Sequence, residues 1–337
     1  MAEHGSLKLL GPIPHMPAGY APITLASALG YAEEDGLDLQ NVAAGSPNDA
    51  VAGVLAGTGD CTFVNTAFGF AVRDRGDPLK MFFSFARHAN RSFAVPADSS
   101  IKSIADLRGA TIGLHFPDLM YFAHAALVDE GVDPATDVEF VPLPGSPVDA
   151  EMMTDAVRGG GIHAIWQLDL NYGLFEAEDL PLRRLPSRTI DRLTPSACLY
   201  TTDSFAESRP GALAVLGRSV ARATLFAQTN PEAAVRVLWK HVPEARPKAG
   251  EEERVLRRDV ASLKSRLENQ RIDNTADPRW GVITEDEIER WQEFMFSSGA
   301  IKSRRATSEY FRGDLIDQFN DFDHEAVVAE ARAFRVD

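Results

Sequence analysis

The first 86 residues alternate between strand-like and helix-like runs, and this alternation restricts the fold more than any other feature of the sequence. The strand-like runs cover residues 7–13, 38–44, 61–65 and 79–86, and the helical patterns cover residues 19–35, 47–56 and 66–75. Strand–helix–strand units of this length predict an α/β fold with a mostly parallel sheet. Because ligands bind such sheets at the carboxyl ends of the strands, the residues directly after each run are candidates for function.

The same pattern returns after residue 97. A short helix is expected between Ser103, which can cap it together with Asp106, and Gly109, which can end it. Further strand-like and helical runs then alternate over residues 111–115, 117–130, 138–143, 148–158 and 162–166. Residues 196–202 form one more strand-like run and lead into an almost entirely helical tail. The sequence therefore predicts two α/β units, with the tail helices packed on the first.

Length and charge restrict the class of protein. The chain has 337 residues, more than the roughly 100 to 200 of one typical domain, and 45% of them are hydrophobic. Its formal net charge is -15, and its densest basic stretch, residues 254–266, is interleaved with acidic residues. Since nucleic-acid binding needs a concentrated basic surface, we expect no nucleic-acid partner.

The sequence contains no segment that suggests insertion into a membrane. No apolar run reaches the roughly 18 residues needed to span a bilayer, and residues 1–10 lack the pattern of an export signal. We therefore expect no direct membrane insertion. The protein is then extracytoplasmic or periplasmic if a signal was removed, and cytoplasmic if Met1 is the native start.

Several stretches resemble one protein family in the order in which that family has them. They are ALGYAEEDGLDLQNV (28–42), GTGDCTFVN (57–65), IKSIADLRGATIGL (101–114), GGIHAIWQLD (160–169) and two stretches of the tail, 204–235 and 280–302. Together they are similar to the type II periplasmic binding proteins, in the group that binds nitrate, taurine, alkanesulfonates and thiamine pyrimidine precursors. The two tail stretches resemble the thiamine-precursor branch in particular.

This resemblance implies a two-lobed fold with crossovers near residues 96 and 198. Lobe one would contain residues 1–96 and 198–337, including the C-terminal helices, and lobe two would contain residues 97–197. A ligand bound between the lobes favours the closed state, because contacts from both lobes exist only there. We therefore expect the solute-binding protein of an ABC-type importer, which captures a small polar or heteroaromatic molecule by hinge closure. A small-molecule ligand and an ABC permease are the expected partners.

The candidate ligand-binding residues of lobe one follow its strands. They are His15, Met16, Tyr20, Gly45, Ser46, Asn65, Thr66, Phe85 and Arg87. Several have a simpler alternative interpretation: His15 can be an exposed loop histidine, Asn65 and Thr66 can cap a helix, and Arg87 can form an ion pair at the hinge surface.

The candidates of lobe two follow its strands in the same way. They are His115, Phe116, Asp118, Tyr121, Trp166, Gln167 and Asp169. Asp118 can instead favour the positive end of a helix, and Trp166 can be a core residue or can stack on a flat ligand. Aromatics, histidines and carboxylates outnumber cations in the whole set, which favours a flat heteroaromatic such as a thiamine pyrimidine precursor over a sulfonate or nitrate.

An enzyme on the same fold, without a signal and acting on a small aromatic or heterocyclic substrate, is the alternative. The aromatic sulfinate desulfinases use a cysteine in the first loop, and the fungal-type pyrimidine synthases use a cysteine-rich motif and a lysine; this chain has neither pattern. His15, His115 and Asp169 are the remaining candidates for acid/base chemistry. The histidines have no metal-ligand spacing and the cysteines no CxxC spacing, so we expect no metal and no cofactor.

Overall fold

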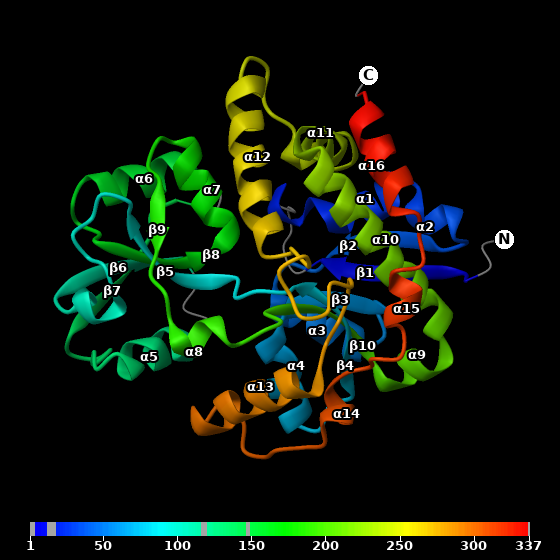
Figure 1. Ribbon diagram of the computed structural model, residues 1–337, viewed down its shortest axis with the longest axis horizontal. Coiled ribbons are helices and arrows are strands. Elements are labelled where there is room, and N and C mark those ends of the chain that lie inside the picture. The colour runs from blue at the N-terminus through cyan, green and yellow to red at the C-terminus, as the bar shows by residue number, and fades with distance from the viewer. Residues whose placement is uncertain (1–3, 12–17, 116–119, 146–148, 336–337) are drawn as a thin grey trace.

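The computed structural model describes residues 4–11, 18–115, 120–145 and 149–335, and it contains two five-stranded sheets flanked by helices (Figure 1). The strand order is β2-β1-β3-β10-β4 in the first sheet and β7-β6-β8-β5-β9 in the second. We call each sheet with its flanking helices a lobe, the first and the second. The predicted two-lobed α/β fold is confirmed.

The first lobe begins with four strands that run in one direction. They are β1 (Ser6–Gly11), β2 (Asp38–Ala43), β3 (Cys61–Asn65) and β4 (Leu79–Ala86). The fifth strand, β10 (Ala197–Thr202), lies antiparallel between β3 and β4. The connections contain η1 (Ala18–Tyr20), α1 (Ala21–Ala28), α2 (Tyr31–Glu34), α3 (Pro47–Leu55) and α4 (Thr66–Asp74).

The second lobe repeats this plan. Its strands are β5 (Arg91–Pro96), β6 (Ala110–Leu114), β7 (Val138–Pro142), β8 (Ala164–Leu168) and β9 (Leu182–Arg184). Here β5 is the strand that lies antiparallel to its neighbours, β8 and β9. The helices are η2 (Ile104–Leu107), α5 (Met120–Asp129), α6 (Ala150–Arg158), α7 (Asp169–Ala177) and α8 (Arg188–Asp191).

The chain changes sheet twice. It passes from β4 to β5 between Ala86 and Arg91, and it returns from β9 to β10 between Arg184 and Ala197. The sequence predicts the first change near residue 96. In the structure it comes a few residues earlier, because β5 already pairs with β8 in the second sheet. The assignment of residues 1–96, 97–197 and 198–337 to lobes stays a prediction.

The tail after β10 is helical, as predicted. It contains α9 (Asp203–Ser208), α10 (Pro210–Thr229), α11 (Pro231–His241), η3 (Pro243–Ala245), α12 (Glu252–Glu268), α13 (Glu285–Ser297), α14 (Thr307–Tyr310), α15 (Ile316–Phe319) and α16 (His324–Ala333). Helix α10 is mostly buried and packs on α1. Within the described part of the chain, no helix is long and apolar enough to cross a membrane.

Two tail helices also contact the second lobe. Helix α12 packs along α7, and α13 packs on α4 and reaches α5 through aromatic rings. Figure 1 shows α12 at the top of the molecule and α13 at the bottom, on either side of the crossing strands. Trp291 of α13 joins the lobes directly, since its ring centroid lies 6.0 Å from that of Phe70 and 5.7 Å from that of Phe122.

Local sequence signals explain the element boundaries that the sequence predicts well. Ser103 and Asp106 form the expected capping box at the start of η2. The helical pattern over residues 19–35 is divided into η1, α1 and α2, because Gly30 takes φ 81° and ends α1 there. The sequence did not predict β5, β9 or α7.

Helices α7 and α12 touch backbone to backbone at Gly173. A Cβ atom at this position would lie 2.1 Å from the carbonyl oxygen of Ala261. No side chain fits there unless one helix moves, so glycine sets how closely the second lobe approaches the tail.

We predict that Gly173→Ala lowers the free energy of unfolding by about 1 to 3 kcal/mol, because the added methyl group overpacks the contact between α7 and α12. Urea denaturation followed by circular dichroism measures this. Gly161→Ala is the matched control, since a Cβ at Gly161 meets nothing within 4 Å. Equal stability of the two variants would show that the close approach is unimportant.

Candidate functional site

The two lobes meet at a small cavity whose lining includes two of the predicted residues. The cavity has a volume of about 20 Å³ and is lined by Asn65, Ala89, Asn90, Arg91, Phe122, Trp166, Ile190, Leu193, Ser196 and Trp291. Asn65 belongs to the first lobe, Trp166 to the second and Trp291 to the tail. Asn65 is the last residue of β3, whereas Trp166 lies in the middle of β8 and not at its carboxyl end.

Asn65 combines a structural role with a position at the cavity. Its side-chain Oδ1 accepts from the backbone N–H of Ala67 at 3.0 Å and so caps α4. Its Nδ2 makes none of the side-chain hydrogen bonds found among the described residues. Both interpretations of Asn65, helix cap and cavity residue, therefore hold together.

Trp166 is a core residue whose indole N–H group lacks a hydrogen-bond partner among the described residues. Its side chain is 0% exposed, and its ring centroid lies 4.7 Å from that of Phe93. Its indole Nε1 is buried and has no hydrogen-bond partner in the described part of the chain. The ring is thus sandwiched in the core, whereas its donor is unused.

Arg91 is a cavity residue that the sequence analysis missed. It begins β5, a strand whose short run RSFAVP was not recognised, so its position at the cleft could not be inferred. Arg91 lowers the pKa values of Tyr20, Tyr121 and Tyr172, although burial raises all three more strongly. Its positive charge therefore acts on tyrosines from both lobes.

Asp169 bridges the lobes at the start of α7. Its Oδ1 lies 2.9 Å from Arg266 Nη2, its Oδ2 accepts from Asn269 Nδ2, and its backbone oxygen accepts from Ser265 Oγ at 2.7 Å. Asp169 is 4% exposed and Arg266 is 0% exposed. Burial raises the pKa of Asp169, and Arg266 and Asn269 oppose that shift. Its carboxylate is thus engaged by the tail and does not line the cavity.

Tyr20 and Phe85 form an aromatic cluster under Arg266. The Tyr20 ring lies 5.4 Å from that of Phe63 and 6.4 Å from that of Phe85, and the Arg266 guanidinium lies 5.0 Å above the Tyr20 ring. Phe85 is buried in the core of the first lobe. Because these rings pack on one another and on Arg266, they position η1 against α12.

Arg87 forms the ion pair that was the alternative to ligand contact, but the pair is buried. Its Nη2 lies 3.3 Å from Glu287 Oε1, and both side chains are less than a tenth exposed. The guanidinium also donates to the carbonyl oxygen of Val282. Arg87 therefore holds the segment before α13 against β4 rather than sitting at the hinge surface.

His115 and Gln167 form a hydrogen-bonded pair in the second lobe. Gln167 Nε2 donates to His115 Nδ1 at 2.8 Å, and Gln167 is 1% exposed. Burial lowers the pKa of His115, and hydrogen bonds to the backbone of Pro144 and Gly145 oppose that shift. A neutral His115 is consistent with an accepting Nδ1.

The other predicted residues are more dispersed. Ser46 caps α3 by accepting from Asp49 N–H at 3.1 Å beside the exposed Gly45, and Thr66 is buried and donates to the carbonyl oxygen of Pro195 at 2.7 Å. Tyr121 lines a separate hollow of about 390 Å³ between α3, α4 and α13. His15, Met16, Phe116 and Asp118 lie outside the described residues.

The described residues offer little for nucleophilic or metal chemistry. Cys61 and Cys198 are free and buried, and burial raises the pKa of both thiols, that of Cys198 to about 12. In the ranges that the structure describes, no group of three or more His, Cys, Asp or Glu residues could hold a metal ion. His115 and Asp169 each have their own partner and do not bond to one another.

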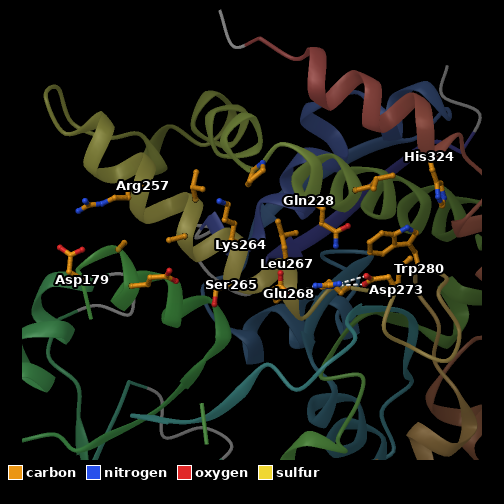
Figure 2. A pocket seen from close by; sticks show the side chains of 18 residues that line it. Asp179, Gln228, Arg257, Lys264, Ser265, Leu267, Glu268, Asp273, Trp280 and His324 are labelled. Atoms are coloured by element: carbon orange, nitrogen blue, oxygen red, sulfur yellow. Dashed lines mark hydrogen bonds and ion pairs between the residues drawn. The ribbon is translucent and has the colours of Figure 1, made fainter. Parts of the chain in front are cut away.

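A larger hollow of about 1040 Å³ lies elsewhere, between α12, α10 and the end of α7 (Figure 2). Its lining carries both signs of charge, and Arg271 is paired there with Glu268 and Asp273. None of the residues predicted for the site lines it. We therefore regard the inter-lobe cavity as the better candidate despite its smaller volume.

The family model described as NMT1/THI5 like matches residues 18–234. This match covers more than half of the chain and every strand of the two sheets except β1. The chain belongs to the NMT1/THI5-like family. Among curated proteins, none matches the sequence of this NMT1/THI5-like protein.

Solved structures share the fold of this NMT1/THI5-like protein. The alkanesulfonate-binding protein SsuA from Xanthomonas axonopodis pv. citri, bound to MOPS, is 14% identical with a TM-score of 0.62, over 91% of this chain and 98% of that one. The aliphatic sulphonate binding protein SsuA from Escherichia coli is 15% identical with a TM-score of 0.62, over 90% and 91%. The desulfurization enzyme DSZB is 15% identical with a TM-score of 0.59, over 94% and 98%.

We predict that Asp169→Asn lowers the free energy of unfolding by about 3 to 5 kcal/mol, since it leaves the Arg266 charge buried without its counter-charge. The double variant with Arg266→Met should be less destabilised than the sum of the two single variants. Urea denaturation of all four proteins gives the coupling energy. Strictly additive effects would contradict a coupled pair. Asp273→Asn, in the exposed pair with Arg271, is the control and should change stability little.

We also predict a pH dependence from His115. Its pKa is lower in the folded state than the ordinary value of 6.5, so the unfolded chain binds the proton more readily. The free energy of unfolding should therefore be unaffected above that value and should fall as the pH drops below it. His115→Asn, whose amide oxygen can still accept from Gln167, should have a shallower fall. Identical pH profiles for the variant and the parent would refute this assignment.

Proposed function

We propose that the protein is a solute-binding protein that holds a small molecule between its two lobes. The observation that carries this proposal is the composition of the cavity at their junction. Asn65 comes from the first lobe, and Arg91 and Trp166 come from the second. A molecule that contacts all three stabilises the closed arrangement of the lobes, because an open arrangement separates Asn65 from the other two. Membership of the NMT1/THI5-like family and the similarity to solved sulfonate-binding proteins support the proposal.

The small size of the cavity fits the proposal only if the lobes part to admit the ligand. A volume of about 20 Å³ accepts one water molecule, whereas small-molecule sites usually measure about 300 to 1,000 Å³. The hollow beside Tyr121, of about 390 Å³, is within that range. Tyr121 and Phe122 are consecutive, their ring centroids are 4.5 Å apart, and each lines one of the two spaces. A ligand with a polar group near Arg91 and an apolar body near Tyr121 suits this arrangement.

The charged residues at the lobe junction differ from those that the sequence analysis expected, and this widens the class of ligand proposed. Asp169 is bound by Arg266 and Arg87 by Glu287, so neither of these two side chains is available to a ligand, and Arg91 is among the residues that line the cavity. The arginine at the cavity is therefore Arg91 and not the predicted Arg87. A thiamine pyrimidine precursor with an acceptor group and a sulfonate-like molecule both remain within the proposed class. An importer role implies an ABC permease as the partner and a location outside the cytoplasmic membrane.

We predict that a compound of this class raises the melting temperature and is recovered unchanged by mass spectrometry. A ligand at about a hundred times its Kd adds roughly 2.7 kcal/mol to stability, which a thermal-shift screen detects easily. The panel should contain pyrimidine precursors of thiamine, sulfonates, taurine, nitrate and small aromatic acids. Recovery of a converted product would favour the enzymatic alternative.

Two variants test where the ligand binds. Arg91→Gln should abolish the stabilisation, and Lys264→Gln should leave it intact, because Lys264 lines the larger hollow of Figure 2 and not the inter-lobe cavity. The opposite result would move the ligand to that hollow. No stabilisation of the folded protein by any compound would count against a solute-binding function.

A further inference from the structure

The C-terminal end of α12 contacts both the second lobe and the segment that leads to it. Asn269 directly follows α12, and its backbone oxygen accepts from the backbone N–H groups of Arg87 at 2.8 Å and His88 at 3.2 Å. Both residues lie in the first crossover, between β4 and β5. The side chain of Asn269 donates from Nδ2 to Asp169 Oδ2 at the start of α7. One residue of the tail therefore joins the crossover to the second lobe.

The rest of the first crossover is also bound at this place. Ser196, in the second crossover, donates from its backbone N–H to the carbonyl oxygen of Ala86 at 2.9 Å and from its Oγ to the carbonyl oxygen of His88. The backbone N–H of Asp169 donates to the carbonyl oxygen of Asn90 at 2.9 Å. Because a hinge is a short segment that absorbs changes in φ and ψ, a rotation of the lobes about this crossover must alter some of these bonds.

Helix α12 is attached differently to the two lobes. It buries Val255, Leu263 and Leu267 in the apolar cluster that contains β1 and β3 of the first lobe. Among the described residues, the apolar cluster that includes Leu174 and Phe175 of α7 contains no residue of α12. Toward α7, the helix instead presents the ion pair and hydrogen bonds described above. Polar groups can bond to water when they separate, so α12 stays with the first lobe more readily than with the second.

The polar contacts of α12 with the second lobe are incompletely satisfied. Arg266 is 0% exposed and uses Nη2, which lies 2.9 Å from Asp169 Oδ1 and 3.3 Å from the Tyr20 hydroxyl. Its Nε and Nη1 are buried and have no hydrogen-bond partner in the described part of the chain. Buried donors of a charged group that lack partners cost free energy. Separation of the lobes would admit water to these atoms and offset part of the loss of the ion pair.

We propose that the end of α12 is a releasable clamp that holds the second lobe against the first, and that Asn269 is its positioning residue. The clamp consists of Ser265, Arg266 and Asn269. The backbone of Asn269 holds the crossover and its side chain holds α7, so it couples the conformation of the hinge to the position of the lobe. This connection is non-covalent, additional to the two crossovers, and lies beyond the family match of residues 18–234.

The distance between the lobes tests the clamp, and double electron–electron resonance measures it on the full chain without added ligand. Spin labels are attached at Glu207→Cys in α9 and Glu139→Cys in β7, because both side chains are exposed and lie in different lobes. The native cysteines, Cys61 and Cys198, are buried and so poorly accessible to the label.

Asn269→Ala removes the donor to Asp169 and keeps the backbone oxygen that holds the crossover. We expect a second inter-lobe distance to appear or grow, with the ratio of separated to joined lobes about tenfold higher, as the strength of a hydrogen bond to a carboxylate implies. Asn41→Ala is the matched control. It also removes one amide donor, but the bond lost, to Ser27 Oγ at 2.9 Å, lies within the first lobe. The control should leave the distance distribution unchanged.

A side-chain exchange gives a readout that a loss of packing does not produce. Asn269→Asp places a second carboxylate beside Asp169 and should separate the lobes more than Asn269→Ala does, because like charges repel. Adding Asp169→Asn restores an amide–carboxylate pair in the opposite direction. This double variant should return the distance distribution toward that of the parent, and circular dichroism shows whether it is folded. If it does not fold, the two single variants of Asn269 decide the question.

The clamp and the solute-binding function fail in different ways. An unchanged distance distribution in both Asn269→Ala and Asn269→Asp overturns the clamp, whatever the thermal-shift screen finds. An equal change in Asn269→Ala and the Asn41→Ala control overturns it as well. A change specific to the Asn269 variants supports the clamp even if no compound of the panel binds, and in that case only the solute-binding function is refuted.

Discussion

The ion pair between Asp169 and Arg266 is the interaction on which the arrangement of the lobes depends. It connects the first residue of α7 to a tail helix that belongs with the first lobe, and it is almost completely buried. Removing two charges from water is costly, so a buried pair specifies an arrangement more than it stabilises one. Here Asn269 and Ser265 add hydrogen bonds to the same residue, and four residues further along α7 Gly173 makes its close contact with the same tail helix.

The tail holds the second lobe from two sides. On one side, α12 contributes Arg266 to Asp169 and to the Tyr20 ring. On the other, α13 contributes Trp291 between Phe70 and Phe122, and its N-terminal Glu287 binds Arg87 near the crossover. The cavity with Asn65, Arg91 and Trp166 lies where these supports meet the crossing strands. If the lobes part to admit a ligand, as proposed, the tail contacts of Arg266 and Trp291 are disturbed as well.

Local signals in the sequence predicted most strands and helices. They could not predict the roles of Asp169 and Arg91, because these depend on contacts between residues far apart in the chain. The runs at 61–65 and 79–86 match β3 and β4 because apolar residues bounded by turns give a clear strand signal. The carboxylate of Asp169 seemed available to a ligand because its partner Asn269 is 100 residues away in the chain. Arg91 was missed because β5 pairs only with β8 and β9, and no local pattern reveals such pairing.

The residues that line the cavity and the α12 residues that hold the lobes together lie in different parts of the chain relative to the family match. All the cavity residues except Trp291 fall within the region that matches the NMT1/THI5-like family model, residues 18–234. Arg266, Ser265 and Ala261 of α12 lie beyond that region. Substitutions in α12 can thus alter how readily the lobes separate without replacing a side chain that lines the cavity. Under the proposed function, ligand affinity and ligand choice are therefore separable traits, open to change by independent steps.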